Sequence, residues 1–141
     1  ETVATIEGVT FVNDSKATNT DSLQVALESF ERPVVLIAGG RDKGQDFHPL
    51  ADAVERHTRH VVLIGEGADT LEKAWGGAAL ERAASLADAV DRAFEAARRA
   101  EAGVVLLSPG CSSFDMFRDF EDRGIPFKDE VARLRAREAH A

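Results

Sequence analysis

Short apolar runs rich in β-branched residues alternate along the chain with longer stretches in which apolar residues recur at the spacing of a helix. Three of the four strongest runs are continuously apolar, which is typical of strands buried on both faces of a parallel sheet. The predicted strands are Val9–Asn13, Val34–Ala38, Val61–Ile64 and Val104–Leu107, with Leu80–Ala83 as a further short candidate.

The stretches between these runs place apolar side chains one helical turn apart. The predicted helices are Ser22–Phe30, Pro49–His57, Asp69–Trp75, Leu86–Ala100, Phe114–Arg123 and Asp129–Ala139. We expect Pro126 to keep the last two apart, because proline lacks an N–H and clashes with the preceding turn. Strands that alternate with helices predict an α/β sheet with helices on both faces.

The composition is that of an ordinary globular protein. The chain has 141 residues, of which 44% are hydrophobic, so we expect one domain spanning residues 1–141. Its net charge of −8 argues against nucleic acid as a partner, and any bound anion needs a local site. Cys111 is the only cysteine, which suits a reducing compartment. Because no apolar stretch could span a membrane and Glu1 replaces a starting Met, we expect a cytoplasmic domain cut from a longer protein.

The loop after the first predicted strand is unusually polar. In open α/β sheets, ligands bind beyond the carboxyl ends of the strands. Seven of the eight residues Asn13–Thr20 are polar, although capping the next helix needs only one or two such residues. The alternative to turn chemistry is an anion or nucleotide site, with Lys16 as its cation and Asp14 as a hydroxyl or metal partner.

A glycine-rich loop, Gly39–Gly44, follows the second predicted strand. Glycines tolerate a positive φ and let backbone amides approach a ligand closely. The loop matches neither the phosphate-binding loop nor the dinucleotide fingerprint, and a flexible turn remains the alternative. Lys16 and Lys43 are two of only four lysines and lie in two such loops, which favours a shared anionic ligand.

The last predicted strand leads into a loop of small residues, Ser108–Asp115. Free amides and hydroxyls before a helix suit a carboxylate or a phosphate. Cys111 as a nucleophile would need a nearby base, and no histidine is placed to provide one. Phe114, Phe117 and Phe120 follow at a spacing of three, which is more typical of a core than of a ligand site.

Two further patterns indicate structure rather than chemistry. Gly65–Thr70 lacks the last glycine of the dinucleotide fingerprint and is interpreted as a turn, with Asp69 or Thr70 near a helix start. His57 and His60 could be half of a metal site, but no Cys or carboxylate has the spacing to complete it. We interpret both histidines as surface residues.

Three loops taken together resemble one domain of a known enzyme family. Asn13–Asn19 (NDSKATN), Gly39–Lys43 (GGRDK) and Ser108–Phe120 (SPGCSSFDMFRDF) resemble the C-terminal domain of the Mur ligases that add D-glutamate, the MurD group. The following residues up to Phe127 fit as well, and the likeness extends from about Gly8 to Leu134. It implies a Rossmann-like three-layer domain with a mostly parallel sheet of about six strands, one of them possibly antiparallel.

The resemblance also implies an activity. These ligases join D-glutamate to UDP-N-acetylmuramoyl-L-alanine in peptidoglycan precursor synthesis, using ATP and Mg²⁺ and an acyl-phosphate intermediate. Their C-terminal domain binds D-glutamate and closes over ATP. Carried over by position, the D-glutamate ligands would be Thr18, Lys43, Ser113 and Phe120. Asp14 would contact the nucleotide, and Lys16 would be both a nucleotide ligand and the catalytic cation.

The chain departs from the complete family pattern. It has no Gly-Lys-Thr phosphate loop, no metal-ligand cluster and no uridine-nucleotide domain. We therefore expect ATP and Mg²⁺ to be held mainly by other domains of the same polypeptide, a monomer, and this chain to be inactive alone. The alternative is a stand-alone α/β module that binds another small anion. A complete nucleotide-dependent enzyme is disfavoured by the missing phosphate loop.

Overall fold

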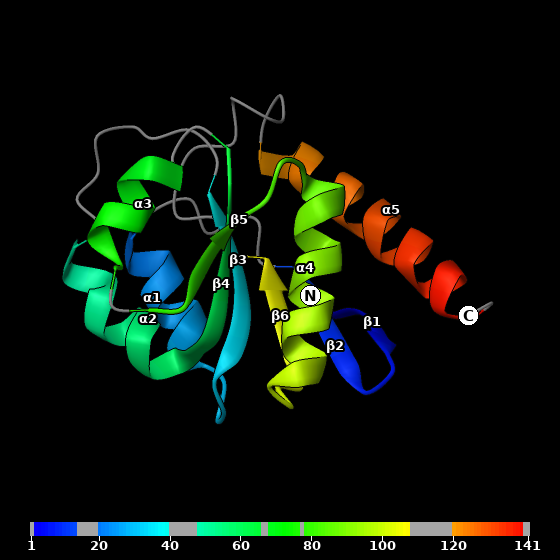
Figure 1. Cartoon of the computed structure of the whole chain (residues 1–141), viewed down its shortest axis with the longest axis horizontal. Coiled ribbons are helices and arrows are strands. Elements are labelled where there is room, and N and C mark those ends of the chain that lie inside the picture. Colours follow the sequence, from blue (N-terminus) through cyan, green and yellow to red (C-terminus); the bar gives the residue numbers. More distant parts are fainter. Residues whose placement is uncertain are drawn as a thin grey trace.

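A six-stranded sheet forms the centre of the computed structural model, which describes residues 2–13, 20–39, 48–65, 68–76, 78–107 and 120–139 (Figure 1). The strand order is β1-β2-β6-β3-β4-β5. The strands are β1 (Thr2–Ile6), β2 (Val9–Asn13), β3 (Val34–Gly39), β4 (Thr58–Ile64), β5 (Leu80–Arg82) and β6 (Val104–Leu107). All neighbours pair in parallel except β1 and β2. The predicted α/β fold with a mostly parallel sheet is therefore confirmed.

The antiparallel pair is a hairpin at one edge of the sheet. Glu7 and Gly8 connect β1 to β2 and both have a positive φ, of 50° and 81°. Only Ile6 of the β1 residues is buried, so this edge strand carries almost no hydrophobic pattern. That is why the apolar runs located β2 but not β1.

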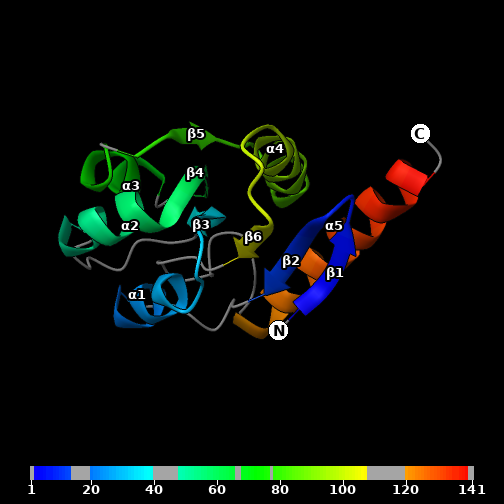
Figure 2. The ribbon, with the colours of Figure 1, turned by 90° about the horizontal axis from the view of Figure 1, so that it is seen from below.

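Helices cover both faces of the sheet, as predicted (Figure 2). One face carries α1 (Thr20–Glu28), α2 (Ala51–His57) and α3 (Ala68–Ala74), with a short 3₁₀ turn at His48–Leu50 before α2. The other face carries α4 (Leu86–Arg99) and α5 (Phe120–Ala139). Each face has its own apolar core: Phe11 and Phe94 stack on the α4 side with ring centroids 6.2 Å apart, and Trp75 is buried on the α3 side.

The C-terminal helix differs from the prediction. A single helix, α5, runs from Phe120 through Pro126 to Ala139 instead of breaking at the proline. An internal proline removes one backbone hydrogen bond, a cost of about 3 kcal/mol or more that packing elsewhere along a helix can offset. Val131 and Leu134 of α5 are buried against the α4 side of the sheet, and this packing extends beyond the proline. The predicted segment 114–119 lies outside the described residues.

Candidate functional site

The strands β2, β6 and β3 are neighbours in the sheet (Figure 1). The three polar or glycine-rich loops begin at the carboxyl ends of these strands. The register pairs Asn13 with Leu107 and Leu107 with Ile37. Neighbouring strands lie about 4.8 Å apart, so the chain leaves β2 and β6 side by side. Strand β3 continues two residues further, to Gly39, which pairs with Ile64 of β4. The segments 14–19, 40–47 and 108–119 therefore start from neighbouring points.

The chain also changes direction at this edge. After β2 it continues into α1 on one face, and after β6 it continues into α5 on the opposite face. Strand β6 is the last to enter the sheet and lies between β2 and β3. Where the connections after two neighbouring strands lead to opposite faces, an open α/β sheet offers a crevice for a ligand beyond the carboxyl ends of those strands.

The side chains proposed to bind ligands are not themselves described. Asp14, Lys16, Thr18, Lys43 and Ser113 lie outside the described residues, as does Cys111. Phe120 is the first residue of α5, and the structure describes its backbone but not its side chain. The structure therefore brings together the starting points of the three loops.

Gly39 is the described residue that constrains this edge most tightly. Its φ is +144°, and a Cβ placed on it would overlap the carbonyl oxygen of Ile64 and lie 2.8 Å from the carbonyl carbon. Two separate requirements, an unusual φ and a close approach of two backbones, thus demand glycine at the point where the Lys43 loop begins. Gly39 thus uses the conformational freedom that glycine allows.

The loop after β4 has a structural role. The Ala68 N–H donates to the Gly65 carbonyl, α3 begins at Ala68, and Asp69 lies in its first turn as predicted. The Arg82 guanidinium donates hydrogen bonds to Asp69 and Glu72, which raise the pKa of Arg82 above its ordinary value, Asp69 contributing most. These ion pairs join the end of β5 to α3.

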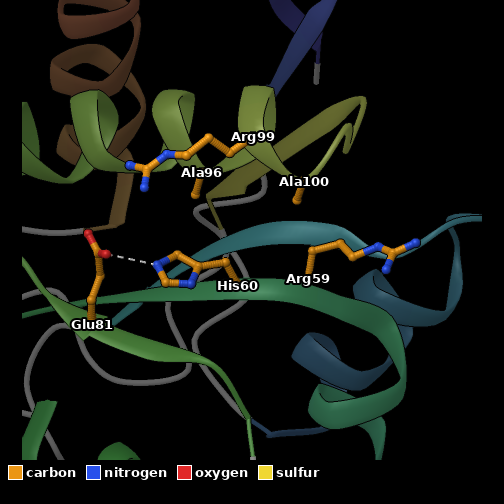
Figure 3. Close-up of a pocket in the computed structure, with 6 residues that line it drawn as sticks. All are labelled: Arg59, His60, Glu81, Ala96, Arg99 and Ala100. Carbon is orange, nitrogen blue, oxygen red and sulfur yellow. Dashed lines mark ion pairs between the residues drawn. The ribbon is translucent and has the colours of Figure 1, made fainter.

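The interpretation of both His57 and His60 as surface residues was wrong for His60. His57 ends α2, whereas His60 lies in β4 with its side chain 20% exposed. His60 Nε2 is 3.0 Å from a carboxylate oxygen of Glu81 on β5 (Figure 3). Sequence spacing missed this contact because the two residues are joined by the parallel register of β4 and β5. Within the described part of the chain, no group of three or more His, Cys, Asp or Glu residues could hold a metal ion.

Among the described helices, none is long and apolar enough to cross a membrane. Residues 1–111 match the protein family described as "Mur ligase, glutamate ligase domain". A UDP-N-acetylmuramoylalanine–D-glutamate ligase of Salinibacter ruber is 49% identical over 136 residues, which cover 95% of this chain and 29% of the relative. Ligases of the same name from Myxococcus xanthus and Bordetella avium are 50% and 49% identical, covering 95% and 94% of this chain. The chain spans 29% of the Myxococcus relative and 26% of the Bordetella relative.

Proposed function

Because the chain belongs to the Mur ligase, glutamate ligase domain family, we propose that it is the D-glutamate-binding domain of an ATP-dependent ligase. The full enzyme would join D-glutamate to UDP-N-acetylmuramoyl-L-alanine during peptidoglycan precursor synthesis. Three relatives that carry this activity in their names match 94–95% of the chain. Since the chain spans less than a third of each, the remaining parts of the reaction would belong to other domains of the same polypeptide.

The topology of the sheet is the single observation that best supports this proposal. Three motifs separated by up to about 90 residues in sequence leave from β2, β6 and β3, which are neighbours in the sheet. D-Glutamate carries two carboxylates, and a chain with a net charge of −8 can bind it only where cations and amides are concentrated. Lys16 and Lys43 belong to two of the converging loops.

Each proposed residue has a role in this reaction. Lys43 would pair with one D-glutamate carboxylate, Ser113 would hold the other through its hydroxyl or amide, and Thr18 and Phe120 would complete the pocket. The acyl phosphate would form when the γ-phosphate of ATP passes to the precursor carboxylate and ADP leaves. The D-glutamate amine would then attack, with inorganic phosphate as the leaving group.

Two residues would act on the nucleotide side of the pocket. Asp14 would contact ATP, and Lys16 would stabilise the negative charge that develops during transfer. Mg²⁺ and most of the ATP contacts would come from a domain outside this chain. Closure of this domain over ATP would exclude water from the acyl phosphate. We propose a cytoplasmic, monomeric enzyme that has no nucleic acid or membrane partner.

Replacing Lys43 in the full-length ligase tests the assignment. We expect Lys43→Ala to raise the apparent KM for D-glutamate by about tenfold or more, because a charge-assisted hydrogen bond to a carboxylate is lost. Steady-state kinetics with D-glutamate varied, at saturating ATP and precursor, provide the measurement.

Lys73 offers the matched control, since it is an exposed lysine in the last turn of α3. Lys73→Ala should leave the KM for D-glutamate unchanged. A Lys43→Ala enzyme with wild-type KM for D-glutamate would remove Lys43 from the site.

A further inference from the structure

A pocket of about 280 Å³ lies near the amino end of β4, away from the carboxyl ends of the strands where the three loops begin. Its lining comes from the beginning of β4, from β5 and from the C-terminal end of α4 (Figure 3). The lining residues are Arg59, His60, Glu81, Ala96, Arg99 and Ala100. The two alanines leave the space open where longer side chains on α4 would fill it.

The cations of this pocket are not neutralised by neighbouring acids. Among the described residues, Arg59 and Arg99 form no ion pair, whereas six other arginines pair with carboxylates: Arg56, Arg82, Arg92, Arg98, Arg133 and Arg137. Glu81 is the only acid of the lining, and Arg92 lies 3.5 Å from it on the side of α4. The two arginines and Glu81 give the lining two positive charges and one negative charge, a local reversal of the −8 of the chain.

His60 adds a donor that the protein does not satisfy. Its Nε2 is buried and has no hydrogen-bond partner among the described residues, although a Glu81 oxygen lies 3.0 Å away. A buried polar atom without a partner is costly, and a ligand oxygen would relieve that cost.

Three carbonyls in the last turn of α4 are occupied by backbone donors. The carbonyls of Ala96, Ala97 and Arg98 accept backbone N–H groups from residues 100–102. Figure 3 shows Arg99 extending toward the side of the pocket where Glu81 and the His60 imidazole lie, whereas Arg59 points along β4 in the other direction. Arg99 thus lies on the same side of the pocket as the His60 imidazole, and Arg59 adds a second positive charge to the lining.

We propose that this pocket binds a small oxyanion, the phosphate or carboxylate group of a metabolite, at a site separate from the D-glutamate site. Arg99 donates to the ligand oxygens, and His60 donates through Nε2.

NMR titration of the 141-residue chain tests the proposal, with sulfate as the phosphate-like probe and succinate as the carboxylate probe. Ionic strength is held constant with NaCl, since screening alone shifts exposed charges. The His60 ring signals, assigned with His60→Gln, should shift saturably with at least one of the two probes.

Variants distinguish a built site from general charge attraction. Arg99→Gln should weaken binding about tenfold and Arg59→Gln about threefold, because each removes one cation. Arg135→Gln is the matched control, since Arg135 is exposed, lies on α5 and forms no ion pair with the described residues; its binding should equal the wild type. Saturation by one probe alone identifies the ligand group as phosphate-like or carboxylate. Saturation by neither, or equal binding by Arg99→Gln and wild type, overturns the proposal.

Discussion

Gly39 links the sheet to the proposed site at the scale of a single residue. Its positive φ and the overlap that any Cβ would make with the Ile64 carbonyl make it the least replaceable described glycine. We expect Gly39→Ala to lower the free energy of unfolding by about 2–4 kcal/mol, because backbone strain and a backbone clash add. Urea denaturation followed by circular dichroism measures the loss.

Two other glycines separate the causes of that loss. Gly8 has a positive φ of 81° but open space around a Cβ, so Gly8→Ala should cost only about 1 kcal/mol. Gly103 has neither feature, and Gly103→Ala should change the free energy by less than about 0.5 kcal/mol. Equal losses for Gly39→Ala and Gly103→Ala would show that the end of β3 is not constrained as described.

The start of α4 shows how local pairs stabilise an element. The Ser85 hydroxyl accepts from the Asp88 N–H at 3.1 Å, and the Asp88 carboxylate accepts from the Ala84 N–H at 2.9 Å. Arg92, one turn further, also donates to Asp88 at 3.0 Å. The hydrogen bond from Ala84, and then that from Arg92, lowers the pKa of Asp88 below its ordinary value of 3.8. This reciprocal arrangement satisfies backbone donors that a helix start leaves free.

The lowered pKa predicts a pH dependence with a definite sign. A carboxyl group whose folded pKa lies below its unfolded value stabilises the protein above the unfolded pKa, and this stabilisation is lost as pH falls through the folded pKa. Asp88→Asn should therefore lower the free energy of unfolding by about 1 kcal/mol at neutral pH, and the difference should shrink below pH 3.8. Urea melts over that pH range provide the measurement.

Asp52 supplies the control for this effect. It pairs with Arg56 at 3.0 Å on the surface of α2, with its side chain 78% exposed. Asp52→Asn should change the free energy by less than about 0.5 kcal/mol at any pH, because exposed ion pairs contribute little. A deficit for Asp88→Asn that stays constant down to acid pH would mean that the Asp88 charge does not stabilise α4.

Elements with a strong hydrophobic pattern were predicted well, and those without one were not. Strands β2 and β6 match their predicted bounds, and α4 matches to within one residue, because β2 and β6 are short apolar runs and the buried positions of α4 follow the helical period. Strand β1 was missed, since Ile6 alone of its residues is fully buried. The continuous α5 was missed because local chemistry at Pro126 was weighed without the tertiary packing of Val131 and Leu134.

The order of strands is a property of the whole molecule that local patterns do not contain. The insertion of β6 between β2 and β3 depends on contacts between segments far apart in the sequence. The prediction that polar loops follow the strands could be made from sequence, but their convergence at one switch point required the topology. His60 and Glu81 illustrate the same limit, because register alone brings them together.

In the whole molecule, the two proposed binding sites occupy different ends of the sheet. The three loops begin at the carboxyl ends of neighbouring strands, where we propose D-glutamate binds. The pocket lined by Arg99, His60 and Glu81 lies near the amino end of β4 and would bind an oxyanion independently. Because glutamate also carries carboxylates, it could bind at both sites. A preference for the D-enantiomer identifies the D-glutamate site, and the Arg99→Gln variant weakens binding in the other pocket.

Titration of D-glutamate and of L-glutamate into the Arg99→Gln chain, followed by backbone amide NMR, tests the central claim most directly. The account predicts weak, saturable shifts at Thr18, Lys43 and Ser113 that are larger for the D-enantiomer, with weakness expected because the other domains are absent. A stand-alone module for another anion would show no preference between enantiomers. Shifts confined to other surfaces, or equal responses to both enantiomers, would contradict the claim that these three loops form a D-glutamate site.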